Sequence, residues 1–151
     1  MAPGSSGAGL LRGSVMSEDH EFPAREGKPL GNERLDAHHA MERHLADRLE
    51  RSIIEKSGIT VLSELFEELC DYVVLHFTTE EKIMVEAEYP ETSSHQAHHD
   101  RMRENLFELE KRFRSGDTSA APDTLALLRQ WAFHHIPTAD RAFAQYLLER
   151  R

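Results

Sequence analysis

The stretch His76-Phe77-Thr78-Thr79-Glu80, together with His95-Gln96-Ala97-His98-His99 further along the chain, decides the fold. In each stretch two polar side chains stand at positions i and i+4, which lie one turn apart on the same face of an α-helix. The apolar residues on either side follow the spacing of an amphipathic helix, and these polar residues fall on that same spacing. The sequence therefore predicts two helices that bury histidines and a carboxylate in their core faces.

Four helical segments are expected, at about residues 33–56, 60–88, 92–114 and 122–150. Gly58 is expected to end the first helix and Thr60 to cap the second, while Ser115-Gly116-Asp117 is expected to form the turn after the third. Short connections favour antiparallel neighbours. The predicted fold class is all-α, an antiparallel up-down-up-down four-helix bundle with a metal site in the core.

The last helix contains an irregular feature. Pro137 removes a backbone hydrogen bond to Phe133, and a bend is expected there. Asp140 follows His135 by five residues, which stacks poorly on an ideal helix. A local distortion at Pro137 would help both side chains reach one point. The expected core face of this helix is Leu128, Trp131, His135, Ala139, Ala142 and Tyr146.

Length and composition limit the class of protein. The 151 residues suit one domain, with residues 1–28 expected to be a flexible N-terminal tail and residues 29–151 the bundle. A net charge of −9 argues against nucleic acid or an anionic membrane as the main partner. The single cysteine, Cys70, excludes an internal disulfide, and no apolar run reaches the ~20 residues of a membrane span. A cytoplasmic location is expected.

The core faces of the four expected helices together carry a set of metal-ligating side chains: His39, His76, Glu80, His95, His99, His135 and Asp140. A structural zinc ion takes four ligands, so two metal ions bridged by the carboxylates account better for this set. The nitrogen-rich mixture suits iron, although zinc, copper and nickel also accept imidazole. The alternative is a bundle core whose polar residues are satisfied by hydrogen bonds alone.

Other histidines compete for these positions. His38 is the rival of its neighbour His39, and the helical periodicity favours His39. His44, His98 and His134 fall off the core faces and are expected to face solvent.

These residues in this order resemble the hemerythrin family, and within it the single-domain bacteriohemerythrins. The similar stretches are residues 30–39, residues 76–84, Tyr89-Pro90 with His95 and His99, and Trp131 with His135-Ile136 and Asp140. The resemblance covers about residues 30–148, and its ordered spacings are highly specific. It implies a four-helix bundle that holds two Fe ions, bridged by an oxo or hydroxo group, and binds O2.

The resemblance also implies a role for each ligand. Three histidines, His95, His99 and His135, would hold one iron, which has no open position. His39 and His76 would hold the second iron, which binds O2 end-on as hydroperoxide, and Glu80 and Asp140 would bridge the two ions. A dry apolar pocket around the O2 is required, because water would release peroxide and leave the centre ferric.

Two residues depart from the family pattern in the expected cofactor pocket, which is lined by Glu42, Trp131, Ala132 and Ile136. Glu42 and Ala132 each stand where the family usually has leucine or a similar apolar residue. One hypothesis is that Glu42 ligates the open iron or exchanges protons beside it, which favours oxidation or peroxide chemistry over clean O2 release. The alternative is that its carboxylate extends to the rim of the bundle.

Four functions follow, in order of preference. The first is an O2-binding protein for storage, delivery to an O2-using enzyme, or sensing, which also accepts peroxide or small diatomic ligands. The second is a di-iron peroxidase or oxidase that uses Glu42. The third is an iron store or ferroxidase, against which stand the histidine-rich site and the lack of a cage. The fourth is a structural bundle with zinc.

Overall fold

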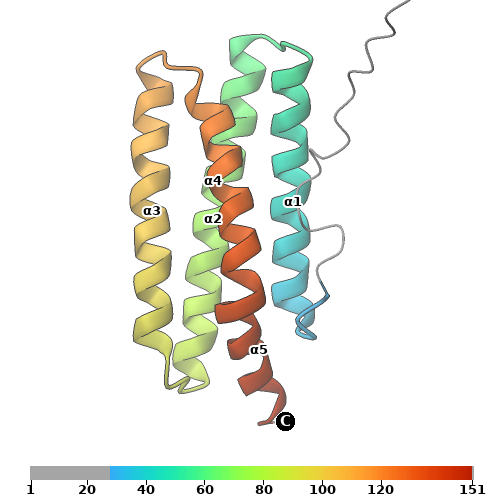
Figure 1. Cartoon of the computed structure of the whole chain (residues 1–151), viewed down its shortest axis with the longest axis vertical. Coiled ribbons are helices and arrows are strands. Elements are labelled where there is room, and N and C mark those ends of the chain that lie inside the picture. The colour runs from blue at the N-terminus through green and yellow to red at the C-terminus, as the bar shows by residue number, and fades with distance from the viewer. Residues whose placement is uncertain (1–27, 151) are drawn as a thin grey trace, which may run out of the picture.

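The computed structural model describes residues 28–150 as a bundle of helices, with no strand among them. Its elements are α1 (Glu33–Ile54), α2 (Ile59–Glu86), α3 (Thr92–Arg114), α4 (Ala120–His134), a π-helical turn η2 (Ile136–Asp140) and α5 (Arg141–Leu148). The chain reverses direction between α1 and α2, between α2 and α3 and between α3 and α4, so neighbouring helices are antiparallel, while α4, η2 and α5 run on in one direction (Figure 1). The predicted all-α up-down-up-down bundle is confirmed. The flexible tail predicted for residues 1–28 lies, except for residue 28, outside the described residues.

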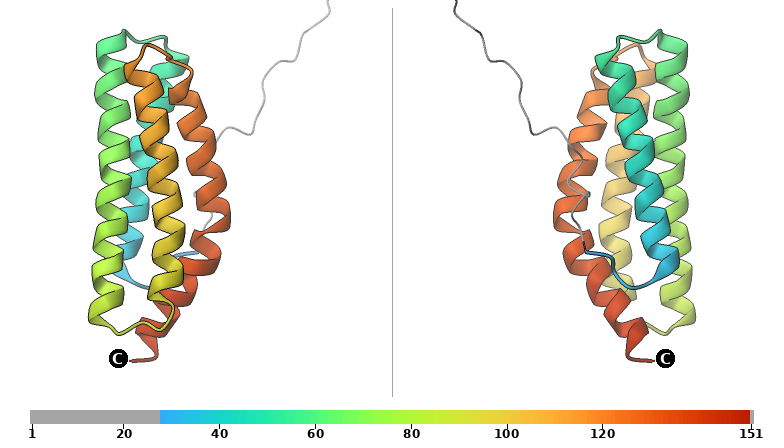
Figure 2. Two further views of the ribbon diagram at one scale, coloured as in Figure 1. Left: turned by 90° about the vertical axis from the view of Figure 1, so that its left-hand side faces the viewer. Right: turned by 90° about the vertical axis from the view of Figure 1, so that its right-hand side faces the viewer.

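The four long helices form a closed ring. Helix α1 packs against α2 and α4, and α3 packs against α2 and α4. Both side views show the helices running alongside one another over most of their length (Figure 2). A residue on the inner face of any helix therefore points into a space that the other three helices also face.

The start of α1 is fixed by side chains that satisfy free backbone N–H groups. The side-chain oxygen of Asn32 accepts a hydrogen bond from the backbone N–H of Leu35 at 3.2 Å. The Asp36 carboxylate accepts from the N–H groups of Leu30 and Gly31 at 2.7 and 3.1 Å. Gly31 has a φ of 83°, which a glycine adopts at little cost. These contacts hold the beginning of α1 at the end of the bundle where the polar residues lie.

The connection between α1 and α2 differs from the prediction. Helix α1 ends at Ile54, and Lys56 takes the left-handed conformation with a φ of 52°. The N–H of Ser57 then donates to the carbonyl of Ser52 at 3.0 Å, which closes the helix end. Gly58 is extended and precedes the first residue of α2, so the predictions that Gly58 ends α1 and that Thr60 caps α2 are wrong. The backbone hydrogen bonds at Ser57 fix this end without a glycine.

The last helix is interrupted at the predicted proline. It begins at Ala120 rather than Pro122, and after α4 the turn η2 is π-helical, with the N–H of Asp140 donating to the carbonyl of His135 at 3.3 Å. The wider turn holds one extra residue, so the inner face shifts by one position after it. Ala142 is consequently exposed and Phe143 is buried, which corrects the predicted core face.

Two apolar clusters fill the bundle on either side of a polar layer. The larger cluster comprises Leu45, Ala46, Leu49, Phe66, Leu69, Cys70, Val73, Phe77, Met102, Leu106, Leu109, Phe113, Ala120, Ala121, Leu125 and Leu128. The smaller cluster comprises Leu30, Leu35, Met84, Phe143 and Ala144. In α1, in α2 and in the interrupted last helix the polar core residues fall between members of the two clusters, whereas α3 contributes only to the larger cluster. Among the described residues, no helix combines the length and hydropathy that a membrane span requires.

Candidate metal centre

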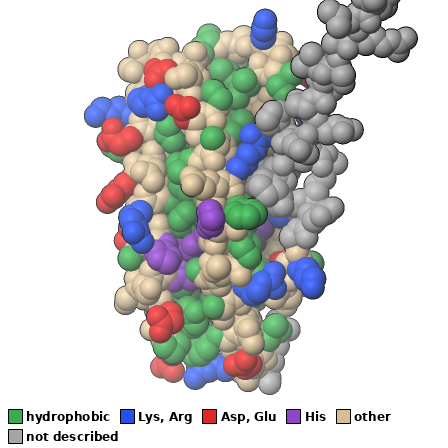
Figure 3. Space-filling view, in the orientation of Figure 1, with side chains coloured by type: hydrophobic (Ala, Val, Ile, Leu, Met, Phe, Trp, Pro, Cys, Tyr) green, Lys and Arg blue, Asp and Glu red, His purple; other side chains and the backbone are tan. Residues whose placement is uncertain are grey.

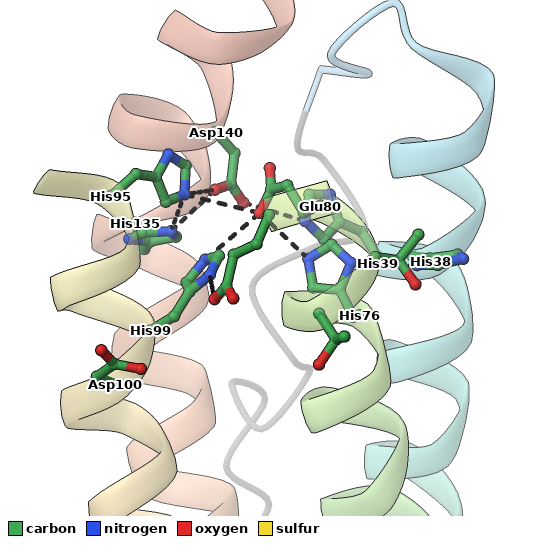
Figure 4. A network of polar contacts seen from close by, with 12 residues as sticks. His38, His39, His76, Glu80, His95, His99, Asp100, His135 and Asp140 are labelled. Carbon is green, nitrogen blue, oxygen red and sulfur yellow. Dashed lines mark hydrogen bonds and ion pairs between the residues drawn. The ribbon is translucent and has the colours of Figure 1, made fainter. Parts of the chain in front are cut away.

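The structure brings the whole predicted ligand set together in the polar layer. His39 comes from α1, His76 and Glu80 from α2, and His95 and His99 from α3. His135 follows α4 directly and Asp140 ends η2. Each of the seven side chains is at most 6% exposed. They converge on one volume in the centre of the bundle (Figure 4).

Three histidines and one carboxylate form the first group of potential ligands. Ligand atoms of His95, His99, His135 and Asp140 all lie within 4.8 Å of one another. Oδ1 of Asp140 is 3.0 Å from Nε2 of His95 and 2.8 Å from Nε2 of His135. The π-helical turn explains how Asp140 reaches His135, because a wider turn places residues five apart on one face.

Two histidines and the same carboxylate form the second group. Ligand atoms of His39, His76 and Asp140 lie within 4.8 Å of one another. The other carboxylate oxygen of Asp140, Oδ2, is 3.1 Å from Nε2 of His39. Asp140 thus directs one oxygen to each group of histidines.

Glu80 lies between the two groups. Its Oε2 is 3.4 Å from Nε2 of His99, 3.6 Å from Nε2 of His95 and 3.9 Å from Nε2 of His76. Neither of its oxygens has a hydrogen-bond partner. A second carboxylate is therefore positioned beside both groups of histidines, as Asp140 is.

Burial sets the protonation of these groups. Burial lowers the pKa of His76, His99 and His135, which keeps their imidazoles neutral and their lone pairs available. Burial, followed by the charge of Asp140, raises the pKa of Glu80. Burial also acts to raise the pKa of Asp140, but contacts with His135, His39 and His95 outweigh it and hold that pKa well below its ordinary value.

Several buried polar atoms of these residues lack a hydrogen-bond partner, and this indicates that the residues are suited to hold a metal ion. The buried atoms without a hydrogen-bond partner include His39 Nε2, His99 Nε2, Asp140 Oδ1 and both carboxylate oxygens of Glu80. Leaving such atoms unpaired in a core costs about 1–3 kcal/mol each. Neutral imidazoles and carboxylates are good ligands for a divalent transition metal, which would satisfy all of these atoms at once.

Two side chains outside the predicted set contact histidines of that set. Nδ1 of His38 is 3.3 Å from Nδ1 of His76, and Oε1 of Glu81 is 2.8 Å from Nδ1 of His99. Sequence reasoning treated His38 only as a rival of His39 and missed Glu81. The sequence signal was adjacency, because His38 directly precedes His39 and Glu81 directly follows Glu80. From these positions their side chains reach the Nδ1 atom of a histidine on a neighbouring helix.

The remaining predicted histidines behave as expected in two cases. His44 and His134 are exposed. His98 is only partly exposed, because its ring centroid lies 5.8 Å from that of His135. It lines a pocket of about 380 Å³ between α3 and α4, together with His134 and His135. Histidine side chains are visible on this face in Figure 3.

The four predicted pocket residues do lie together beside His39. Glu42, Trp131, Ala132 and Ile136 line a cavity of about 20 Å³ with His39. A larger pocket, of about 330 Å³, shares Ala132, Ile136 and His39 with this cavity and opens toward the surface. The ring of Trp131 stacks on that of His135, with centroids 4.0 Å apart.

Glu42 directs its carboxyl group inward. Its Oε1 is buried and has no hydrogen-bond partner. Burial, followed by the charges of Asp140 and Glu80, raises the pKa of Glu42 well above its ordinary value. This oxygen of the carboxyl group therefore lies inside the bundle rather than at its rim.

The sequence matches a described protein family over most of the bundle. The family is described as "Hemerythrin HHE cation binding domain", and the match covers residues 30–147. The bacteriohemerythrin of Methylococcus capsulatus is 33% identical over 86 residues, which are 57% of this chain and 66% of that protein. The bacteriohemerythrin of Stenotrophomonas maltophilia is 32% identical over 83 residues, or 55% of this chain and 54% of that protein. These two matches span between about half and two thirds of the relatives' own length.

Other comparisons cover more of the chain. The bacteriohemerythrin of Aquifex aeolicus is 28% identical over 122 residues, covering 78% of this chain and 91% of that protein. A solved structure described as wild-type hemerythrin superposes with a TM-score of 0.70 at 27% identity, covering 76% of this chain and 87% of that one. The family match, the relatives and the geometry of the ligand set agree, and the chain belongs to the hemerythrin HHE cation-binding domain family.

Proposed function

We propose that this protein binds O2 at a pair of iron ions held in the polar layer of the bundle. The observation that carries the proposal is the position of Asp140, whose two oxygens face two separate groups of histidines. A single carboxylate in that position suits a bridge between two metal ions. The relatives named bacteriohemerythrin support the choice of iron and of O2.

Each ligand has a proposed role. His95, His99 and His135 hold one iron, and His39 and His76 hold the other. Glu80 and Asp140 bridge the two ions. The second ion would have fewer protein ligands, so it would be the one that can take up O2.

Two ferrous ions would supply the electrons that O2 takes up reversibly. The chain's own contribution is to hold the ligands and to keep water away. The larger apolar cluster includes Val73, Phe77 and Leu128 next to the polar layer, and the smaller cluster covers its other side. Dry surroundings favour the return of O2 over its irreversible reduction. The pocket of about 330 Å³ that reaches His39 would be the route by which O2 enters.

A second candidate function is a di-iron peroxidase or oxidase, and one observation favours it. Glu42 places a buried, unpaired carboxyl oxygen in the cavity beside His39. A carboxyl group there is available to ligate the open iron or to exchange a proton with a bound ligand. The small side chain of Ala132 lines both this cavity and the larger pocket.

Storage of iron is less well supported, because the ligand set is rich in histidine and one bundle has no cage for mineral. The cytoplasmic location expected from the sequence stays a prediction. Storage, delivery and sensing of O2 are all compatible with the site.

The test is an optical spectrum of protein loaded with ferrous iron without air, then exposed to O2, then returned to argon. The iron content of the same sample is measured, and about two ions per chain are expected from the two groups of ligands. A visible absorption band that appears with O2 and disappears under argon supports the O2-binding function. Direct and irreversible conversion to a ferric spectrum contradicts it and favours the peroxidase or oxidase.

A further inference from the structure

A chain of polar contacts connects the ligand His99 to the outside of the bundle. Nδ1 of His99 lies 2.8 Å from Oε1 of Glu81, and Nη2 of Arg103 lies 2.7 Å from the same oxygen. Nη1 of Arg103 in turn contacts Oδ1 of Asp100 at 2.9 Å. His99 is fully buried, whereas Glu81 and Arg103 are partly exposed. The contacts therefore run from the metal-binding layer to solvent across α2 and α3.

The contact with Glu81 selects one tautomer of His99. A neutral imidazole carries its proton on one ring nitrogen, and the hydrogen bond at that nitrogen decides which one. A carboxylate only accepts, so Nδ1 of His99 donates its N–H to Glu81. The lone pair is then left on Nε2, which faces Glu80 at 3.4 Å and has no hydrogen-bond partner. This is the nitrogen that a metal ion in the polar layer would use.

Arg103 and Phe77 fix the orientation of this unit. The guanidinium of Arg103 lies 5.5 Å from the centroid of the Phe77 ring. The Phe77 ring stacks on the His99 ring, with centroids 4.1 Å apart and planes 8° from parallel. Glu81 thus holds the edge of the imidazole while Phe77 holds its face, and Arg103 contacts both of these side chains.

We propose that Glu81 and Arg103 are positioning residues for the metal centre: Glu81 holds His99 as the Nδ1–H tautomer with Nε2 directed at the metal, and Arg103 holds Glu81 in place. The inference rests on the proposed metal-binding function and adds to it two residues that are not ligands. A carboxylate acceptor also makes the imidazole a stronger electron donor, so the metal ion on the His95, His99 and His135 side is held more tightly.

The opposite side of the centre has a different partner. Nδ1 of His76 faces Nδ1 of His38, another imidazole, at 3.3 Å. An imidazole, unlike a carboxylate, carries no negative charge, so His38 offers His76 no anionic acceptor. A neutral partner increases the basicity of a ligand less than a carboxylate does. The two metal ions are therefore expected to leave in order, with the ion held by His39 and His76 leaving first.

The variants Glu81→Ala, Glu81→Gln and Arg103→Ala test this inference, with Asp100→Ala as a matched control. The Asp100 side chain contacts Arg103 but not the His99 ring. The variant Asp100→Ala therefore tests only the surface end of this series of polar contacts. The first readout is the tautomer of His99 in metal-free protein, measured from the ¹⁵N chemical shifts of its ring nitrogens. Wild type and Asp100→Ala are expected to show the Nδ1–H form, and Glu81→Ala a mixture.

The second readout is the loss of ferrous iron to a chelator without air. Glu81→Ala is expected to weaken iron binding by about 10–100-fold, and Arg103→Ala by less. Glu81→Gln is expected to lie between Glu81→Ala and wild type, because an amide oxygen still accepts from Nδ1–H. Asp100→Ala is expected to match wild type. Circular dichroism of Glu81→Gln establishes that the bundle is folded.

The inference is overturned if Glu81→Ala retains iron as Asp100→Ala does, if its His99 tautomer is that of wild type, or if the wild-type protein binds no iron. The proposed O2 function fails separately, through the absence of a reversible spectrum in wild-type protein that does hold iron. Iron loss and tautomer therefore report on Glu81 and Arg103 whatever the outcome with O2.

Discussion

Asp140 and His135 are five residues apart in the sequence, yet Oδ1 of one lies 2.8 Å from Nε2 of the other. The π-helical turn Ile136–Asp140 produces this contact. It places a carboxylate where it faces His39 on one side and His95 and His135 on the other. The proposed metal centre depends on this turn, because no other described carboxylate belongs to both groups of potential ligands.

Asp140→Asn is expected to lower the iron content from about two ions per chain to about one or fewer, because an amide is a poor bridging ligand. Metal analysis of protein loaded and desalted without air measures this. Asp123→Asn is the control, since Asp123 pairs with Arg112 at the surface, away from the polar layer. Equal iron content in the two variants would show that Asp140 does not bridge.

Phe143→Ala is expected to destabilise the bundle by about 3–5 kcal/mol, because it removes a fully buried aromatic side chain. Ala142→Gln is expected to change the free energy of unfolding by less than about 0.5 kcal/mol, because Ala142 is exposed. Urea denaturation of both variants distinguishes the π-helical register from a continuous α-helix. The reverse ranking would mean that Ala142, and not Phe143, lies in the core.

Glu42→Leu is expected to stabilise the metal-free protein by about 1–3 kcal/mol at pH 7, because it replaces a buried carboxyl oxygen without a partner. The sign of the pH dependence follows from the raised pKa of Glu42. Above its ordinary value of 4.5 the unfolded chain releases this proton while the folded protein keeps it. The free energy of unfolding of the wild-type protein therefore falls as pH rises from about 4.5 upward, because of Glu42. Glu42→Leu is expected to remove this part of the pH dependence. Parallel pH profiles of the two proteins would contradict the burial of Glu42.

Glu42 also separates the two candidate functions in iron-loaded protein. If Glu42 exchanges protons beside the open iron, Glu42→Gln lowers turnover with hydrogen peroxide by about 100-fold or more. Oxidation of the ferrous protein in air then slows as well. Ala132→Leu narrows the cavity without changing the carboxyl group of Glu42, and it is the comparison for a purely steric effect. Unchanged turnover and oxidation in Glu42→Gln would leave O2 binding as the function.

Cys70 is expected to react slowly with alkylating reagents in the folded protein. Burial, followed by the charges of Glu110 and Asp71, raises the pKa of its thiol far above the ordinary value of 9.0. Since each unit of pKa lowers the thiolate fraction about tenfold, alkylation at pH 8 should be at least about tenfold slower than in denaturant. The unfolded chain ionises above about pH 9 and the folded protein does not, so stability falls there. Equal rates in buffer and in guanidinium would show that Cys70 is accessible.

The fold and the convergence of most of the predicted ligand residues were predictable, because both depend on periodicity along single helices. Histidines at i and i+4 on an apolar face, as in His95 and His99, fix the face and the helix together. The exposure of Ala142 was not predictable. Pro137 indicated that the helix is distorted, but it did not indicate that the distorted turn contains one extra residue. The end of α1 was not predicted, because Lys56 adopts the left-handed backbone conformation that is usually found at glycine.

The contacts of Glu81 and His38 could not be read from one helix. Each partner lies on a different helix, so the pairing depends on how α2 is rotated against α3 and α1. A spacing rule carries no information about that rotation. The inward position of Glu42 was left open for the same reason, since a long side chain on the inner face reaches either the rim or the cavity.

The polar layer divides the interior into a large apolar end and a small one, and this asymmetry has a consequence for the order of folding. The small end holds Leu30 and Phe143, which are far apart in sequence, and the polar layer lies between it and the larger cluster. We expect the large end to fold without metal and the small end to close over the ions afterwards. The backbone amides of α5 would then exchange with deuterium quickly in metal-free protein and slowly once iron is bound. The extent to which the small end and α5 are folded would then depend on how much iron is bound.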